Sequence, residues 1–329
     1  MAVGEQQTQE DEVGGDEFDA NVGWRHTFAR IMEDTTARFG LYVIAVVATI
    51  AVVTTADANL SRLSFGRVDD FTLVESVWYH PERHPDPGTT ERRMPPFFVE
   101  GGSLEHPLGT DRNGRDYISR LIYGTRISFF VGIVATGLGL LGGTIIGAVS
   151  GYYGGWIDDV LMRAVETLYA IPPLVLVIVF TVFVSGGDPD ITYAVFGVGI
   201  AFIPVFARLI RSRVLSVREM DYVEAARATG VKDRDILRRH VIPNSFAPVL
   251  VLATLQIGVT ILIVAGLSFL GYGAQPPTPD WGEMLRISHQ YMHSNPWMSI
   301  WPGMAILITI MGFNLFGDGL QDALDPRIK

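Results

Sequence analysis

Cysteine is absent from the 329 residues of this chain, and lysine is nearly so. Without cysteine the chain has no disulfide, no thiolate nucleophile and no cysteine-based metal site, and its redox compartment is left undetermined. Lys232 and Lys329 are the only lysines among 25 basic residues. Neither lies within a glycine-rich run before serine or threonine, as a Walker-type phosphate loop requires. We therefore expect any ATP that this protein depends on to be handled by another polypeptide.

Signals for catalysis, metal binding and nucleic-acid binding are also missing. No nucleophile elbow or Ser-His-Asp order is present, and the arginines are scattered. His289 and His293 have the four-residue spacing of a shared helical face, but no carboxylate completes a metal site. His80 and His84 have the same spacing, but Pro81 disfavours a helix there. We expect no catalytic residue, no metal site and no cofactor bound by this chain itself, and no nucleic-acid partner.

Long apolar runs dominate what is present, in a chain that is 48% hydrophobic. A bilayer core ~30 Å thick requires roughly 20 helical residues to cross it. Helices are favoured over barrel strands, because lipid offers unpaired backbone groups no partner and the runs lack strand alternation. We predict an all-α polytopic membrane protein with a lipid-bilayer partner and six transmembrane helices. The predicted spans are at about 39–56, 128–150, 165–184, 191–207, 246–270 and 298–317.

Charges that flank these runs predict the orientation in the membrane. Arg25, Arg30 and Arg38 precede the first run, whereas Asp57 follows it. Positively charged flanks remain in the cytoplasm, so the N-terminus is expected there, and six crossings return the C-terminus to the same side. The short loops agree, because residues 208–245 contain nine basic side chains and the two short loops predicted outside contain one and none.

This topology divides the chain into five parts. An acidic cytoplasmic tail precedes the first transmembrane helix, and an extracytoplasmic segment separates that helix from a five-helix core. A short cytoplasmic tail follows the core. The predicted boundaries are 1–38 for the acidic tail, 39–57 for the first transmembrane helix, 58–127 for the extracytoplasmic segment, 128–318 for the core with its cytoplasmic loop at 208–245, and 319–329 for the last tail.

The acidic charge is concentrated near the N-terminus. Residues 1–24 contain seven acidic side chains and no basic one, in a chain of net charge −10. Acid excess with scarce lysine suits a cell-membrane protein of a high-salt organism. A disordered acidic tail, encoded by an arginine-rich genome, explains residues 1–24 equally well.

The second apolar run has a regular spacing of glycines. Gly139, Gly143, Gly147 and Gly151 recur at every fourth residue and therefore line one face of a helix. Glycine on such a face lets another helix approach closely, which is how many helices associate in lipid. We predict a helix-packing face at these four positions.

The third run has two features that concern its shape. Arg163 and Glu166 are three residues apart near the predicted cytoplasmic end, where they are expected to pair and tether the helix end. The alternative for an intramembrane pair is a place in a transport pathway. Pro172 and Pro173 predict a kink or break in the span.

A charged, helix-forming stretch lies between the fourth and fifth runs. Residues 217–242 predict two helices around a turn, with Met220, Val223 and Ala226 on one face of the first helix. Gly230 occupies the position of a left-handed C-terminal cap. Each apolar face is too narrow to form a core alone, which indicates a protein partner on the cytoplasmic side.

The same stretch contains charged residues with expected local roles. Glu224 and Arg227 are spaced to pair on the first helix. Asp233 is expected to cap the second helix, and Pro243 is expected to end it.

Several runs resemble the membrane subunits of ABC-type importers. EAARATG followed by HVIPN resembles their EAA loop, and LGTDRNGRD, GYYGGWIDDVLMR, LSFLGYGAQPPTPDWGEML and FNLFGDGLQDALDPR resemble the C-type permease subunit of the peptide/nickel branch. Together these runs cover most of residues 104–329. The general loop pattern ends in Ile-x-Leu-Pro, whereas His-Val-Ile precedes Pro243 here, as is typical of the peptide branch. Gln321 replaces an arginine that is common there.

The resemblance implies a type I ABC importer permease fold and a pore-forming subunit for peptides, or alternatively for nickel or sugars. It implies a second homologous permease subunit, two ATPase subunits that use ATP and magnesium, and an extracytoplasmic substrate-binding protein. It also implies that the charged loop is a coupling helix that docks in the ATPase subunit. The matching positions are Glu224, Ala225, Ala226, Gly230, His240 and Pro243.

Two other classes of membrane protein fit the sequence less well. An ion-coupled carrier is expected to have ionisable residues in mid-membrane and internal repeats, and neither is found. A sensor is expected to carry a signalling domain, and only 13 residues follow Phe316. The stretch 274–297 is expected either as a surface helix that faces a binding protein or as a proline-rimmed connector.

Overall fold

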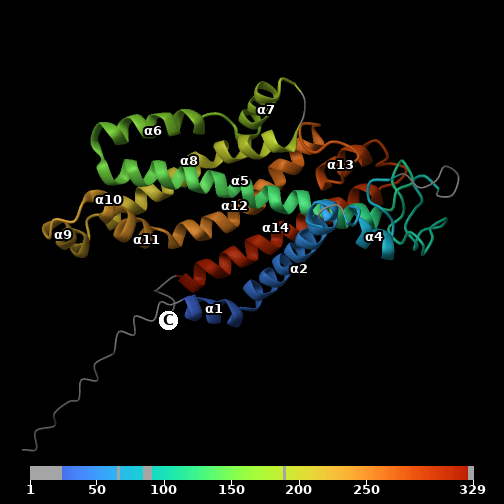
Figure 1. The fold of residues 1–329 in the computed structure, drawn as a ribbon, viewed down its shortest axis with the longest axis horizontal. Coiled ribbons are helices and arrows are strands. Elements are labelled where there is room, and N and C mark those ends of the chain that lie inside the picture. The colour runs from blue at the N-terminus through green and yellow to red at the C-terminus, as the bar shows by residue number, and fades with distance from the viewer. Residues whose placement is uncertain (1–23, 65–66, 84–90, 188–189, 325–329) are drawn as a thin grey trace, which may run out of the picture.

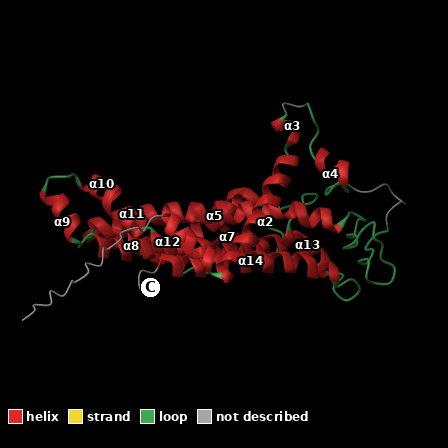
Figure 2. Cartoon of the chain, turned by 90° about the horizontal axis from the view of Figure 1, so that it is seen from below, coloured by secondary structure: helices red, strands yellow, loops and turns green. Residues whose placement is uncertain are grey.

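Helices make up nearly all of the regular structure. The computed structural model describes residues 24–64, 67–83, 91–187 and 190–324. Within these ranges the β-structure is limited to one isolated bridge, between Thr110 and Asp116. The long helices run beside one another along the molecule, and most of the loops gather at its two ends (Figure 1, Figure 2). The predicted all-α fold is confirmed.

Five helices are long and apolar enough to cross a membrane. They are α2 (Thr35–Asp57), α5 (Tyr117–Tyr153), α8 (Ile191–Val217), α12 (Ala247–Phe269) and α14 (Trp297–Leu324). The span predicted at 165–184 is instead divided between α6 (Gly155–Tyr169) and α7 (Pro173–Ser185), which are bent by 92° at the break. Pro172 and Pro173 lie at this break. They interrupt the helix because proline donates no backbone hydrogen bond and clashes with the preceding helical turn. The six predicted spans are therefore five helices and one bent pair.

The helices extend past three of the predicted boundaries. The predicted tail 1–38 includes α1 (Trp24–Glu33) and the start of α2. The end of the predicted extracytoplasmic segment 58–127 is helical and continuous with the second span, as the N-terminal part of α5. α14 likewise runs into the segment 319–329 that is predicted as a tail. The predicted boundaries mark the ends of the apolar runs, and the helices continue past them into polar surroundings.

Aspartate starts four of the helices. The carboxylates of Asp34, Asp116, Asp190 and Asp280 accept hydrogen bonds from backbone N–H groups in the first turns of α2, α5, α8 and α13 (Trp281–His289). A carboxylate at this position satisfies unpaired donors and interacts favourably with the helix dipole. Asp280 is fully buried, and the loss of water raises the pKa of its carboxyl group despite these bonds.

The most extensive contact between helices joins α5 to α8. Gly139, Gly143, Gly147 and Gly151 all lie on the face of α5 that packs against α8. A Cβ atom added at Gly147 would overlap the carbonyl oxygen of Ala207. The two helices therefore meet backbone to backbone, which small residues permit in lipid.

The two ends of the bundle differ in structure (Figure 1). We call one the α9 end, because it contains the loop helices α9 (Asp221–Ala228), α10 (Asp233–Ile236) and α11 (Ile242–Ser245). We call the other the α13 end. It contains α13, the short helices α3 (Leu60–Leu63) and α4 (Thr72–Val77), and the long connection from α4 to α5.

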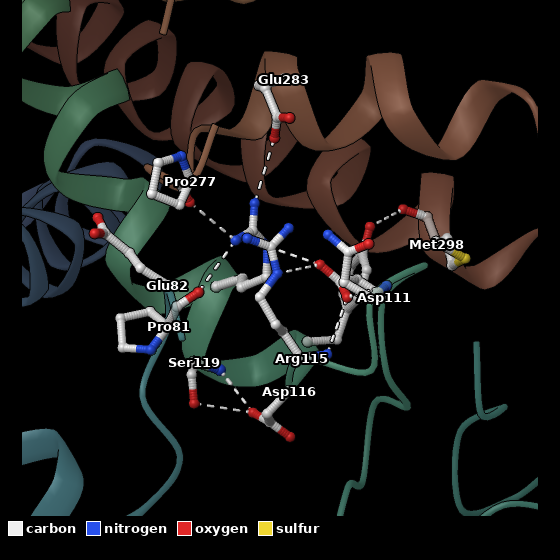
Figure 3. A network of polar contacts seen from close by, with 12 residues as sticks. Pro81, Glu82, Asp111, Arg115, Asp116, Ser119, Pro277, Glu283 and Met298 are labelled. Atoms are coloured by element: carbon white, nitrogen blue, oxygen red, sulfur yellow. Dashed lines mark hydrogen bonds and ion pairs between the residues drawn. The ribbon is translucent and has the colours of Figure 1, made fainter. Parts of the chain in front are cut away.

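A buried ion cluster holds the α13 end together (Figure 3). The Arg120 side chain is 1% exposed and donates to the carbonyl oxygens of Pro81 at 3.1 Å and Pro277 at 3.2 Å. It also lies 3.3 Å from a carboxylate oxygen of Glu283 and 3.5 Å from one of Asp111. Burial raises the pKa of Glu283, and the neighbouring guanidinium of Arg120 opposes that rise. The Arg120 side chain, at the start of α5, thus holds together two segments: the loop before α13 and the connection between α4 and α5.

The stretch 274–297 contains both a connector and a helix, but the helix is not a surface helix. A connector leads to Asp280, and α13 follows. Trp281 and Met284 of this helix are 2% and 3% exposed, so α13 packs into the bundle and does not lie on its surface.

Substitution of Gly147 by alanine should loosen the contact between α5 and α8. The added methyl group overlaps the Ala207 carbonyl, and overpacking of this kind costs about 1–3 kcal/mol of unfolding free energy. Gly137 is the matched control, because no atom lies within 4 Å of a Cβ placed there, and alanine favours a helix over glycine. Denaturant unfolding in mixed micelles measures both variants. A loss in G137A as large as that in G147A contradicts the packing role.

Replacement of Arg120 by methionine should destabilise the α13 end. The buried carboxylates of Asp111 and Glu283 lose the cation that they share, and breaking a buried ion pair costs about 3–5 kcal/mol. R83M is the control, since Arg83 pairs with Glu75 at the surface, where such pairs contribute about 0–1 kcal/mol. The unfolding free energies of the two variants are compared with that of the unchanged chain, and equal losses contradict the role assigned to the cluster.

Candidate functional site in the loop between α8 and α12

The loop between α8 and α12 contains the two helical segments that its sequence predicts. α9 is followed by a turn at Thr229 and Gly230, and the second segment passes from α10 through a π-helical turn, Leu237–Val241, into α11. Gly230 has a φ of 81°, in the left-handed region that side chains rarely adopt. The predicted glycine cap of the first helix is confirmed.

Two expectations for the second segment are wrong. Asp233 does not cap α10, and its carboxylate instead accepts a 2.7 Å hydrogen bond from the Tyr152 hydroxyl. Pro243 does not end the helix, because it follows a π-helical turn, whose shifted hydrogen bonds accommodate a residue without an N–H. The Asn244 side chain donates to the carbonyl oxygen of His240 at 2.6 Å across this turn. The helical path therefore continues almost to the start of α12.

Apolar side chains fasten the loop to the bundle. Val223 of α9 and Ile236 of α10 are fully buried, in the core that also contains Val214 and Val217 of α8. Burying one such side chain stabilises by about 1.5–3 kcal/mol. Met220, which was expected on the same face, is 47% exposed. Both segments of the loop thus share an apolar core with the end of α8.

Polar groups fasten the same loop to the end of α5. Arg218 donates to the carbonyl oxygen of Gly151 at 2.8 Å, in the last turn of α5, where the helix dipole favours a cation. The bond between Tyr152 and Asp233 adds a second connection to this turn. The neighbouring Tyr152 hydroxyl also raises the pKa of Arg227, which therefore remains charged. The loop is held by both helices of the central pair.

The six positions that match the coupling motif differ in exposure. Four are exposed and two are half-buried: Glu224, Ala225, Gly230 and Pro243, and then Ala226 and His240. In the described part of the chain, Glu224 and Arg227 do not form the expected ion pair within 4.0 Å. They line a hollow of about 460 Å³, together with Tyr152, Arg218 and Glu219. A ridge of small side chains beside a charged hollow is suited to docking a protein.

Other candidate residues are not brought together into a site. Arg163 and Glu166 are both described and exposed, and they do not form the expected ion pair. His289 and His293 are exposed near the end of α13, and the described residues contain no group of three or more potential metal ligands. His84 lies outside the described residues.

The residues that hold the loop in place carry no clear signal in the sequence. Tyr152 bonds to a residue 81 positions away, and Arg218 bonds to one 67 positions away. The run Tyr-Tyr-Gly-Gly marks the end of α5, but it says nothing of the partner that the tyrosine finds. These bonds form because the packing of α5 against α8 brings the end of α5 next to the loop.

Similarity to known proteins identifies the family. The model of a family described as binding-protein-dependent transport system inner membrane component matches residues 143–329. The chain belongs to this family. The permease is 37% identical over 314 residues to the dipeptide transport system permease protein DppC of Alkalihalophilus pseudofirmus, covering 95% of this chain and 93% of that one. It is 44% identical over 230 residues to the glutathione transport system permease protein GsiD of Pectobacterium atrosepticum, covering 70% and 75% of the two chains.

A solved structure supports the fold of the permease. The methionine ABC transporter MetNI in inward-facing conformations matches with a TM-score of 0.52 at 16% identity, covering 63% of this chain and 97% of that one. The predicted resemblance to the membrane subunits of ABC-type importers is confirmed. The permease is a membrane subunit of an ABC importer, it is not an enzyme, and ATP hydrolysis belongs to a separate subunit. The alternatives of an ion-coupled carrier and a sensor are rejected.

Replacement of Ile236 by alanine should detach the second segment of the loop from the permease core. Ile236 is fully buried, and removal of such a side chain costs about 2–5 kcal/mol. V231A is the control in the same loop, because Val231 is 38% exposed and surface substitutions usually change stability by about 0.5 kcal/mol or less. Hydrogen exchange of the amides in α9 to α11 measures the effect. Unchanged exchange in I236A contradicts this anchoring.

Proposed function

We propose that the permease forms the pore of an ATP-driven importer that translocates peptides or a related small solute by alternating access. Relatives that cover most of this chain are named as dipeptide and glutathione permeases, and both cargoes are small peptides. Nickel and sugars are the alternative cargoes within the same machinery. A soluble binding protein delivers the cargo, and its selectivity decides most of the choice.

The orientation proposed for the chain puts the α9 end and both termini in the cytoplasm. The support is the charge of the loops, since nine basic residues lie within 208–245 and one lies within 271–297. The α13 end then faces the binding protein outside the cell. We also propose that scarce lysine and excess acid reflect a high-salt organism.

The loop at the α9 end is proposed to transmit force from the ATPase subunit. The observation that carries this proposal is that Glu224 and Ala225 are exposed on a helix whose opposite face buries Val223 completely. Small side chains such as Ala225 and the half-buried Ala226 permit close docking in a groove of the ATPase. Because the loop is fastened to α5 and α8, a push on α9 moves the central helix pair.

The proposed assembly contains a second, homologous permease, two ATPase subunits and one binding protein. ATP and magnesium are bound by the ATPase subunits. Exposed apolar side chains on the bent pair, α6 and α7, are one reason to propose the second permease. Val179 and Phe183 of α7 are 62% and 85% exposed in the isolated chain, and a neighbouring permease or lipid covers such side chains. ATP-driven closure pulls the coupling loops together and opens the pore outward, and release reverses this change.

Reversal of charge at Glu224 tests the coupling role. In E224R the importer should insert and assemble, but ATP-driven uptake of a radiolabelled dipeptide into proteoliposomes should fall by about tenfold or more, because a charged docking contact contributes roughly 1.5–3 kcal/mol. E100R reverses an exposed charge at the opposite end and should retain uptake.

A labelling experiment accompanies this measurement and tests the orientation of the loop. Since the chain has no cysteine, a single cysteine at Thr229 reports which side of the membrane the loop occupies. Labelling of that cysteine from outside intact cells contradicts the orientation. Unchanged uptake in E224R contradicts the coupling role.

A further inference from the structure

A charged groove separates α6 from α8 at the α9 end of the bundle. Its volume is about 360 Å³, within the usual range of small-molecule sites. Three carboxylates and three guanidinium groups line it, so its formal charge is balanced. The lining residues are Asp158, Asp159, Met162, Arg163, Glu166, Arg208 and Arg211.

Two of the lining residues form an ion pair. Arg211 donates to both carboxylate oxygens of Asp158, with an Nε to Oδ1 distance of 2.7 Å. The Ser150 hydroxyl donates to the same carboxylate. The side chains of Arg211 and Asp158 are 34% and 16% exposed. This bidentate pair joins α6 to α8 and to the end of α5, and it accounts for one charge of each sign.

The other four charged groups of the groove are exposed and unpaired in the described chain. Asp159, Arg163, Glu166 and Arg208 are exposed, and in the described part of the chain none of them forms an ion pair within 4.0 Å. Asp159 and Glu166 are near enough to Arg211 to interact with it electrostatically. Two negative and two positive charges are thus held near one another without neutralising one another.

Three of these groups share one face of α6. Asp159, Arg163 and Glu166 follow one another at intervals of four and three residues, which are spacings that allow ion pairs, yet none of these pairs forms within 4.0 Å in the described chain. Across the groove, the guanidinium carbon of Arg208 lies 3.6 Å from the centre of the Tyr169 ring, which holds the cation over an aromatic face and away from the carboxylates. A simple tether would have paired these charges, because unpaired ions near a bilayer are costly.

We propose that this groove is a transient binding site for peptides with free termini. Glu166 binds the peptide ammonium group, whereas Arg163 and Arg208 bind its carboxylate, for which planar guanidinium groups are well suited. This inference rests on the proposed peptide cargo. In the proposed orientation the groove lies toward the cytoplasmic end of the permease, where a weak, open site releases its cargo readily.

Photo-crosslinking of the assembled importer tests the site directly. The probe is a dipeptide of p-benzoylphenylalanine and alanine, added to detergent-solubilised importer without binding protein. Crosslinks should map to α6 and to α8 near Arg208, and unlabelled Phe-Ala should compete with the probe. N-acetyl and amide derivatives of Phe-Ala should compete roughly tenfold less well, because each lacks one charge-assisted contact.

Variants of the groove distinguish binding from proximity. The double variant R163Q and E166Q should lose the crosslinks. R213Q is the matched control, since Arg213 is an exposed arginine of α8 that does not line the groove, and it should retain them. Equal competition by the blocked peptides, or crosslinks that survive in the double variant, overturns the proposal.

Three further outcomes separate this inference from the proposed function. Crosslinks in the isolated chain that vanish in the assembled importer mean that side chains of a partner subunit fill the groove, which overturns the inference. ATP-driven dipeptide uptake without any crosslink in the groove leaves the proposed function standing and overturns the inference alone. Absence of dipeptide uptake overturns the peptide assignment itself.

Discussion

Backbone contact between α5 and α8 is the constraint on which the rest of the permease depends. Four glycines at intervals of four residues remove the side chains that would hold the helices apart. In lipid, apolar surfaces gain little from meeting each other, so close packing takes over as the source of helix association. A larger residue at any of these positions acts on the backbone of α8 or on side chains next to it, and the pair therefore behaves as one body.

Both ends of the molecule are attached to this pair through α5. Arg120, in its first turn, holds the buried ion cluster of the α13 end, and Tyr152, in its last turn, holds the loop of the α9 end. α5 has 37 residues and so spans about 55 Å. Its length contains no proline and forms one continuous helix, so it connects the two ends directly. This geometry suits a subunit in which a motor acts at one end and cargo arrives at the other.

The permease treats charge differently at its two ends. At the α13 end Arg120 is buried and satisfied by carboxylates and carbonyl oxygens, which makes it a structural bond between distant segments. At the α9 end Glu224, Arg163 and Glu166 are exposed and without ion-pair partners in the described chain. Charges of the second kind remain available to a partner or a ligand. The same residue types are thus buried and paired at one end and partly exposed without ion-pair partners at the other.

The sequence alone determined the features that depend on neighbours along the chain. Apolar runs of membrane-crossing length predict the spans, the spacing of Gly139 to Gly151 predicts a packing face, and the run around Gly230 identifies the loop and its left-handed turn. Each of these signals comes from periodicity or from the conformational limits of one residue type. The family followed from the same local motifs.

Tertiary structure decided what depends on residues far apart in the chain. The partners of Arg120 come from segments on both sides of α5, and Asp233 bonds to Tyr152 instead of capping its own helix. The π-helical turn before Pro243 also lies beyond local propensity. Pro172 and Pro173 predict the break between α6 and α7, but its angle of 92° is set in the packed structure. In each case a side chain or a backbone turn adapts to a neighbour that only the packed bundle supplies, and no spacing within a single helix encodes that neighbour.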